Sequence, residues 1–250
     1  MLLEGKRAVI YGGGAIGGAV ARTFAREGAR VFLAGRALEK LERVAADIHD
    51  AGGQVEIAEL DALDERAVDE HADAVAGTAG GIDISFNLIT HGDVQGTPMV
   101  AMAVDDYLRP IATAVRTFFL TSRAAARHMR RQRSGVILVF GGEGDPPRGY
   151  HLGGLQTAFH AMEAMRRQLS AELGGDGVRV VTLRTGGIPE SIPEGFEGRD
   201  TIVSGIEGAT MLGRAATLDD VGNVAAFVAS DRARSMTAAT ANVSCGTLID

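Results

Sequence analysis

Near its start the sequence contains a glycine-rich turn, Gly12-Gly13-Gly14-Ala15-Ile16-Gly17, and no other segment narrows the choice of fold as much. The turn follows the apolar run 7–11 and opens an amphipathic segment at 15–27, so it joins a predicted strand to a predicted helix. In such a turn the first glycine bends the chain sharply, the second lets the backbone approach a pyrophosphate, and the third lets helix and strand pack closely. N–H groups at the helix start then face the anion. The six residues therefore predict a dinucleotide-binding site, although close packing alone would also require glycines here.

Short apolar runs alternate with amphipathic segments along the rest of the chain. The apolar runs lie at 7–11, 30–34, 55–60, 82–89, 136–140, 178–183 and 240–243, and helical spacing recurs at 15–27, 38–51, 65–79, 107–133, 155–173 and 219–230. This alternation predicts an α/β fold with a parallel sheet, whose strands are covered on both faces. We expect residues 1–250 to form a single domain. Residues 186–213 contain many glycines and little periodicity, so we expect a mobile substrate lid there.

Composition and charge exclude several classes of protein. The 250 residues carry a formal net charge of −7, which gives no electrostatic basis for binding nucleic acid or an anionic membrane. The single cysteine, Cys245, excludes an intrachain disulfide and a cysteine-based zinc cluster, and we expect no metal site. The N-terminus does not resemble a signal peptide, and no apolar run approaches the length of a membrane span. We therefore expect a soluble, cytoplasmic protein.

Two residues after the predicted second and third strands bear on which dinucleotide would bind. The second strand is followed by Gly35 and Arg36; an acidic residue there suits the ribose of NAD, whereas an arginine suits the 2′-phosphate of NADP. The sequence thus favours NADP(H) over NAD(H), unless Arg36 is only a solvated residue at a helix start. Asp61 follows the third strand, where it could accept a hydrogen bond from the adenine amino group, cap the next helix, or do both.

Several stretches together resemble the short-chain dehydrogenase/reductase family over nearly the whole chain. They are 15–31, Asp61-Ala62-Leu63-Asp64, 82–87 with its final Asn87, and 213–231. The resemblance implies a Rossmann-like three-layer sandwich of about seven parallel strands with helices on both faces. It also implies a cofactor site that includes Asp61, Ala62 and Asn87, a small-molecule substrate, and a homo-oligomer, tetramer or dimer, built through helices 107–133 and 155–173. The segment 184–188 resembles the family's Pro-Gly turn, which places Gly186 and Ile188 at the nicotinamide carboxamide.

The same resemblance shows where this chain departs from the family. The phosphate turn is one residue shorter than the family's Thr-Gly-x-x-x-Gly-x-Gly. The family's catalytic Asn, Ser, Tyr and Lys fall on Ala114, Gly142, Leu155 and Phe159. Both lysines of the chain lie before residue 41, so no alternative alignment supplies a Tyr-x-x-x-Lys pair.

Substitute proton donors would have to come from the loop 141–151, at the edge of the sheet where such folds bind ligands. The candidate catalytic residues are Tyr150, His151 and Glu143, with His160 as a weaker one. Each could instead be a loop or surface residue without a catalytic role. Loss of general acid catalysis typically costs about 10²–10⁴ in rate, so it slows hydride transfer without abolishing it.

Three hypotheses about function follow. The first is an NADP(H)-dependent oxidoreductase with a non-standard active site, acting on a small apolar carbonyl or conjugated substrate. The second is a catalytically inactive dinucleotide-binding or redox-sensing protein. The third is a non-redox enzyme that reuses the same cleft. The glycine turn supports cofactor binding in the first two, while the replaced catalytic positions weaken the first.

Overall fold

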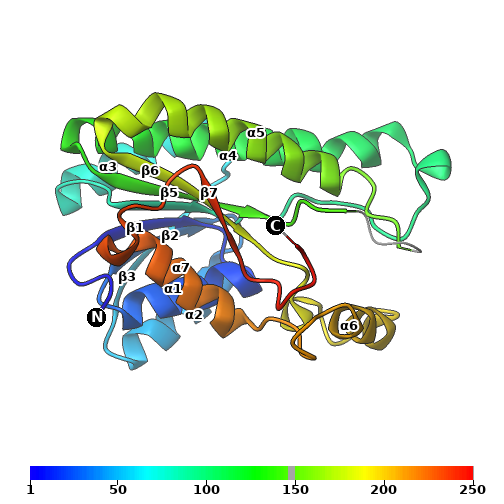
Figure 1. Cartoon of the computed structure of the whole chain (residues 1–250). Coiled ribbons are helices and arrows are strands. Elements are labelled where there is room, and N and C mark those ends of the chain that lie inside the picture. Colours follow the sequence, from blue (N-terminus) through cyan, green and yellow to red (C-terminus); the bar gives the residue numbers. More distant parts are fainter. Residues whose placement is uncertain (146–149, 250) are drawn as a thin grey trace.

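The chain folds around a parallel β-sheet, seen edge-on in the middle of Figure 1. The computed structural model describes residues 1–145 and 150–249, and within them the sheet has seven strands in the order β3-β2-β1-β4-β5-β6-β7. This confirms the predicted Rossmann-like α/β fold of about seven parallel strands. The strands are β1 Arg7–Tyr11, β2 Arg30–Gly35, β3 Gln54–Glu59, β4 Ile84–Asn87, β5 Gly135–Gly141, β6 Val178–Arg184 and β7 Ala239–Asn242.

Helices cover both faces of the sheet. Figure 1 shows α3, α4 and α5 on one side and α1, α2 and α7 on the other, while α6 lies apart from both layers. The α-helices are α1 Ala15–Arg26, α2 Leu38–Asp50, α3 Glu65–Ala79, α4 Val104–Gln132, α5 Leu155–Leu173, α6 Arg199–Gly208 and α7 Leu218–Ala229. Four 3-10 turns complete the described chain: η1 Met99–Ala101, η2 Gly174–Asp176, η3 Pro189–Ser191 and η4 Asp231–Ala233.

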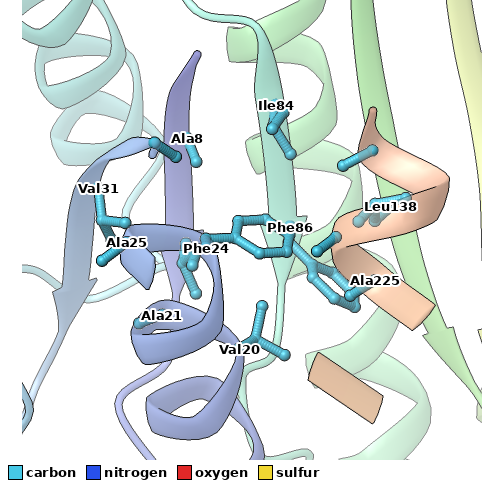
Figure 2. Packing of buried hydrophobic residues seen from close by; sticks show 14 of the residues in the cluster. Ala8, Val20, Ala21, Phe24, Ala25, Val31, Ile84, Phe86, Leu138 and Ala225 are labelled. Atoms are coloured by element: carbon cyan, nitrogen blue, oxygen red, sulfur yellow. The ribbon is translucent and has the colours of Figure 1, made fainter. Parts of the chain in front are cut away.

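The first helix shows how the sequence pattern becomes packing. Val20 and Phe24 lie one turn apart, and both are completely buried between α1 and the sheet. Figure 2 shows Phe24 beside Phe86 of β4, with Ala225 of α7 nearby. Gly28, which has a φ of 92°, follows the helix and lets the chain turn back into β2. The apolar stripe predicted for 15–27 is therefore the contact surface that orients α1 and its N-terminus.

The strand order places a switch point beside β1, where folds of this kind form a ligand-binding crevice. Tyr11, the last residue of β1, pairs with Ala34 of β2 on one side and Asn87 of β4 on the other. The loops that leave β1 and β4 diverge toward opposite faces of the sheet, because β2 follows β1 in the chain while β4 lies on its other side. Ligands of open α/β sheets bind at such a switch point, outside the carboxyl ends of the strands.

In three places the structure departs from the predicted elements by more than one residue. Residues 199–208 form α6 inside the segment expected to be an irregular lid, and no residue of this fully described helix is buried. Helix α4 begins at Val104 rather than at 107, and Pro110 lies inside it. Strand β4 ends at Asn87, which frees residues 88–89 for the loop. Within the described residues, no helix combines the length and apolarity that crossing a membrane would need.

Candidate functional site

The glycine turn between β1 and α1 is fixed by contacts that leave no room for side chains. Gly12 has a φ of 112°, and a Cβ there would overlap the carbonyl oxygen of Leu88 in the loop after β4. A Cβ at Gly17 would overlap the carbonyl oxygen of Gly12, and one at Gly13 would lie 2.5 Å from the Leu41 side chain. Packing accounts for these three glycines, as the alternative interpretation of the turn anticipated.

Gly14 differs from the other three, because a Cβ there would meet nothing within 4 Å. It is the exposed N-cap residue of α1, and no side chain among the described residues caps this helix. The N–H groups of Ala15, Ile16 and Gly17 open the first turn, where they and the helix dipole favour an anion. This open helix start, residues 14–17, has no side-chain cap in the described chain and is called the cradle below. It fits the diphosphate of a dinucleotide.

Basic side chains surround the same end of α1. An open hollow of about 500 Å³ is lined by Gly13 and Gly14 together with Lys40 and Arg43 of α2. Arg36, directly after β2, is exposed, and within residues 1–145 and 150–249 it makes no hydrogen bond or ion pair. Arg22 also lines the hollow, but its charge is paired with Asp47 at 2.7 Å. The hollow therefore presents positive charge next to the candidate diphosphate cradle.

Asp61 and Ala62 follow β3, the edge strand beside β2. Asp61 is exposed, and its Oδ1 accepts a hydrogen bond from the Leu63 N–H at 3.0 Å. The N-cap of α3 is Asp64, which accepts from the Ala67 N–H at 3.1 Å, so the suggestion that Asp61 caps this helix is wrong. The cap falls three residues later because the chain first makes a turn at 61–64. Ala62 is buried, with 2% of its surface exposed.

Asn87, at the end of β4, connects the crevice to α4. Its Nδ2 donates to Thr117 Oγ1 at 3.0 Å, and its Oδ1 accepts from the Ile89 N–H at 3.0 Å. The side chain thus fixes the loop after β4, the same loop that touches Gly12. Beyond β6, Ile188 is buried in the core, and a Cβ at Gly186 would lie 2.6 Å from Thr247. In this segment, backbone groups rather than the Ile188 side chain can face a cofactor.

Two of the four positions that the family resemblance assigns to catalysis, Gly142 and Phe159, lie against each other in this chain. Gly142 directly follows β5, and a Cβ at this position would lie only 2.8 Å from the ring of Phe159. Phe159 lies one turn after Leu155, the first residue of α5. Ala114 is completely buried in α4. The Phe159 ring therefore occupies the space into which a side chain at 142 would project.

Sequence reasoning missed Gln156, which holds the loop after β5 in place. Its Nε2 donates to the Gly142 carbonyl at 3.0 Å, and its Oε1 accepts from the Gly144 N–H at 3.3 Å. Gln156 is the residue after Leu155, and its two hydrogen bonds join α5 to this loop. No sequence motif marks this residue, because its role depends on contacts between segments that only the fold brings together.

Glu143 is buried in a cluster of charged groups. It is 9% exposed, its Oε1 lies 4.0 Å from Arg184 Nη1, and its Oε2 has no hydrogen-bond partner among the described residues. Burial raises the pKa of this carboxyl above its usual range, and the nearby Glu163 raises it further, whereas Arg184 and His160 oppose the shift. The structure thus places Glu143 against β6 and α5.

The other three candidate proton donors lie toward the surface. The Tyr150 hydroxyl donates to Gln95 Oε1 at 2.9 Å, and burial together with Asp93 raises the pKa of this phenol. His151 is exposed, and its carbonyl oxygen accepts from the Gly96 N–H at 2.8 Å. His160 is also exposed, with Nδ1 2.8 Å from the Gln156 carbonyl oxygen. Tyr150 and His151 therefore hold the loop 93–96.

A fifth polar residue, His91, was not singled out from the sequence. It lies in the loop after β4, and its ring meets Phe159 edge-on, with ring centroids 6.0 Å apart at an interplanar angle of 67°. Burial lowers the pKa of this imidazole, and Asp93 opposes the shift in part. A lone histidine in a loop carries little signal, since only the fold reveals that it faces Phe159.

The sheet order and the glycine turn together define a doubly wound α/β protein of the dinucleotide-binding class. Comparison with known sequences narrows this class. The profile of a family described as enoyl-(acyl carrier protein) reductase matches residues 13–247. Meso-2,3-butanediol dehydrogenase of Serratia marcescens is 31% identical over 245 residues, covering 93% of this chain and 90% of that protein. Secoisolariciresinol dehydrogenase of Forsythia intermedia is 30% identical over 239 residues, covering 93% and 85%.

Solved structures agree with the sequence comparison. A short-chain dehydrogenase/reductase from Serratia marcescens superimposes with a TM-score of 0.87 at 25% identity, with 100% of both chains covered. One from Mycobacterium marinum gives a TM-score of 0.86 at 26% identity, with 99% of this chain and 97% of that chain covered. The chain belongs to the short-chain dehydrogenase/reductase family, whose members bind a nicotinamide dinucleotide.

Proposed function

We propose that this chain is an NADP(H)-dependent oxidoreductase with a non-standard active site, acting on a small apolar carbonyl or conjugated substrate. The observation that carries the proposal is the uncapped start of α1, where Gly14 borders open space while the neighbouring glycines are packed against backbone and Leu41. The cofactor residues are the turn 12–17, together with Arg36, Asp61, Ala62, Asn87 and the backbone of Gly186 and Ile188. When bound, NADPH would supply the hydride.

The preference for NADP(H) over NAD(H) rests on charge. Arg36 is exposed after β2, and Lys40 and Arg43 line the hollow beside the turn. In the described part of the chain, none of these three side chains is engaged in an ion pair. Charge-assisted hydrogen bonds to a phosphate group are roughly twice as strong as neutral ones, so these residues would favour the cofactor that carries the 2′-phosphate.

The expected substrate follows from the contact between Gly142 and Phe159. If Ala114, Gly142, Leu155 and Phe159 occupy the family's catalytic positions, the reactive end of the crevice is apolar. Reduction of a simple ketone is then expected to be slowest, because it leaves a strongly basic alkoxide in apolar surroundings. A conjugated carbonyl compound gives a delocalised enolate, and a protonated imine gives a neutral amine. The relatives named as dehydrogenases of butanediol and of secoisolariciresinol also support a small-molecule substrate.

A catalytically inactive, dinucleotide-binding or redox-sensing protein is the second candidate function. The observation that favours it is that the Phe159 ring fills the space beside Gly142. The oxidoreductase and the inactive binding protein require the same dinucleotide site, and they differ only in whether the bound cofactor is turned over.

The test is to incubate the purified chain with NADPH and, in turn, with enones, imines and ketones, and to follow cofactor oxidation. The proposal predicts oxidation with enones or imines, slower oxidation with simple ketones, and weaker activity with NADH. Tight NADPH binding without oxidation by any substrate would support the inactive binding protein. An activity that persists without any dinucleotide would support a non-redox enzyme instead.

A further inference from the structure

The loop after β4 brings one histidine to the candidate active site. The backbone of Leu88 in this loop packs against Gly12, so the loop borders the crevice at the switch point between β1 and β4. Three residues later, the ring of His91 meets Phe159 edge-on. Phe159 in turn packs on Gly142 at the end of β5. His91 therefore lies beside the apolar contact formed by Gly142 and Phe159, where the crevice continues toward β5.

The described residues leave the hydrogen-bonding groups of the His91 ring without partners. Throughout residues 1–145 and 150–249, neither ring nitrogen of His91 has a hydrogen-bond partner, although the ring is only partly exposed. Two of the other candidates have a polar neighbour among the described residues. The Tyr150 hydroxyl donates to Gln95, and Glu143 faces Arg184. A partly buried imidazole without partners is costly unless a ligand or solvent satisfies it.

We propose that His91 binds the carbonyl oxygen of the substrate by donating a hydrogen bond from its ring, with Phe159 forming the apolar surface beside the bound molecule. This proposal rests on the proposed oxidoreductase function and adds its substrate-binding residue. The substrate class it defines is a planar, conjugated carbonyl compound with one hydrogen-bond acceptor. An aromatic ring contacts such a compound through its face or edge, and the neighbouring imidazole fixes the orientation of its oxygen.

In this role His91 only has to donate one hydrogen bond to the substrate oxygen. A neutral imidazole carries one N–H donor and one acceptor nitrogen. Burial lowers the pKa of His91, which keeps the ring neutral near neutral pH despite Asp93. The N–H bond stays intact throughout, because the hydrogen bond only stabilises the negative charge that develops on the substrate oxygen. Removing one such donor from an active site typically lowers kcat by about 10²–10³-fold.

The first experiment measures turnover with NADPH and cyclohexenone as the probe. His91→Phe keeps the aromatic contact with Phe159 but removes the donor, and we expect kcat/KM to fall about 100-fold while NADPH affinity is unchanged. His91→Asn restores an N–H donor and should recover part of the loss. His49→Phe, at an exposed position on α2, is the matched control and should behave like the wild type. Thermal melts of all three variants establish that they fold.

The second experiment does not depend on turnover. The histidine ring signals of the protein are followed by NMR while cyclohexenone is added to the NADP⁺-loaded chain, which cannot transfer a hydride. The His91 signal, identified by its absence in His91→Phe, should shift with saturation, and the His49 signal should not. An unmoved His91 signal up to the solubility limit of the probe, or wild-type kcat/KM in His91→Phe, would overturn the assignment. Absence of NADPH oxidation by the wild type would instead count against the proposed function.

Discussion

At the scale of single residues, a side chain at position 142 and the ring of Phe159 would compete for the same space. A side chain at 142 would project into the Phe159 ring, since the Cβ position lies 2.8 Å from it. We predict that Gly142→Ser lowers the free energy of unfolding by ~1–3 kcal/mol through overpacking. In a Phe159→Ala background the same change should cost clearly less, because the ring is gone. Urea unfolding of the four proteins measures this coupling. Strictly additive effects would show that the two residues do not compete for the same space.

Glu143 gives the protein a pH-dependent stability. Burial raises the pKa of its carboxyl in the folded state above that in the unfolded chain, so the folded state holds the proton more tightly. The stability due to this group is complete below the ordinary pKa of a glutamate, about 4.3, and is lost as the pH rises through the folded-state pKa. We predict that Glu143→Gln gains stability relative to the wild type as the pH rises above about 4.3 toward the folded-state pKa. Thermal melts that show a constant difference over this range would contradict the burial argument.

Helix α7 illustrates how a local sequence signal defines an element. Thr217 accepts from the Asp220 N–H at 3.1 Å, and the Asp220 carboxylate accepts from the Thr217 N–H at 3.0 Å, which forms a capping box. We predict that Thr217→Ala lowers the free energy of unfolding by about 1 kcal/mol, while Thr217→Ser, which keeps the hydroxyl, changes it little. Denaturant unfolding of both variants is the measurement. Equal losses in the two would show that the hydroxyl cap does not stabilise α7.

At the scale of helices and strands, burial explains which elements could be predicted from the sequence and which could not. The strands and the six helices that pack on the sheet have apolar patterns, because burial selects those residues, and Val20 and Phe24 are an example. Helix α6 buries none of its residues, all within the described chain, so it leaves no such pattern. The glycine turn was predictable because its chemistry is local. The contacts of His91 and Gln156 with α5 and the loop after β5 were not, since they join segments far apart in the sequence.

At the scale of the whole molecule, we expect a dimer or tetramer built through α4 and α5. Leu108 and Phe119 of α4 are each 49% exposed in the isolated chain, so both are accessible to a second subunit. We predict that Phe119→Glu shifts the protein to a smaller species in light scattering, whereas Phe196→Glu, at an equally exposed position outside α4 and α5, does not. A wild-type protein that is monomeric at all concentrations would refute this arrangement.

The account as a whole depends on the cradle at the start of α1. Aspartate is a better N-cap than glycine by a few tenths of a kcal/mol, so Gly14→Asp should fold at least as well as the wild type while placing a carboxylate against the bound diphosphate. Gly14→Asn provides a cap of the same shape without the charge.

The most direct measurement is a calorimetric titration of NADPH into the wild type, Gly14→Asp and Gly14→Asn. We predict saturable binding to the wild type, weaker binding to Gly14→Asn, and none to a fully folded Gly14→Asp. Absence of binding to the wild type at millimolar NADPH, or equal affinity in all three proteins, would contradict the central claim that this turn holds the dinucleotide.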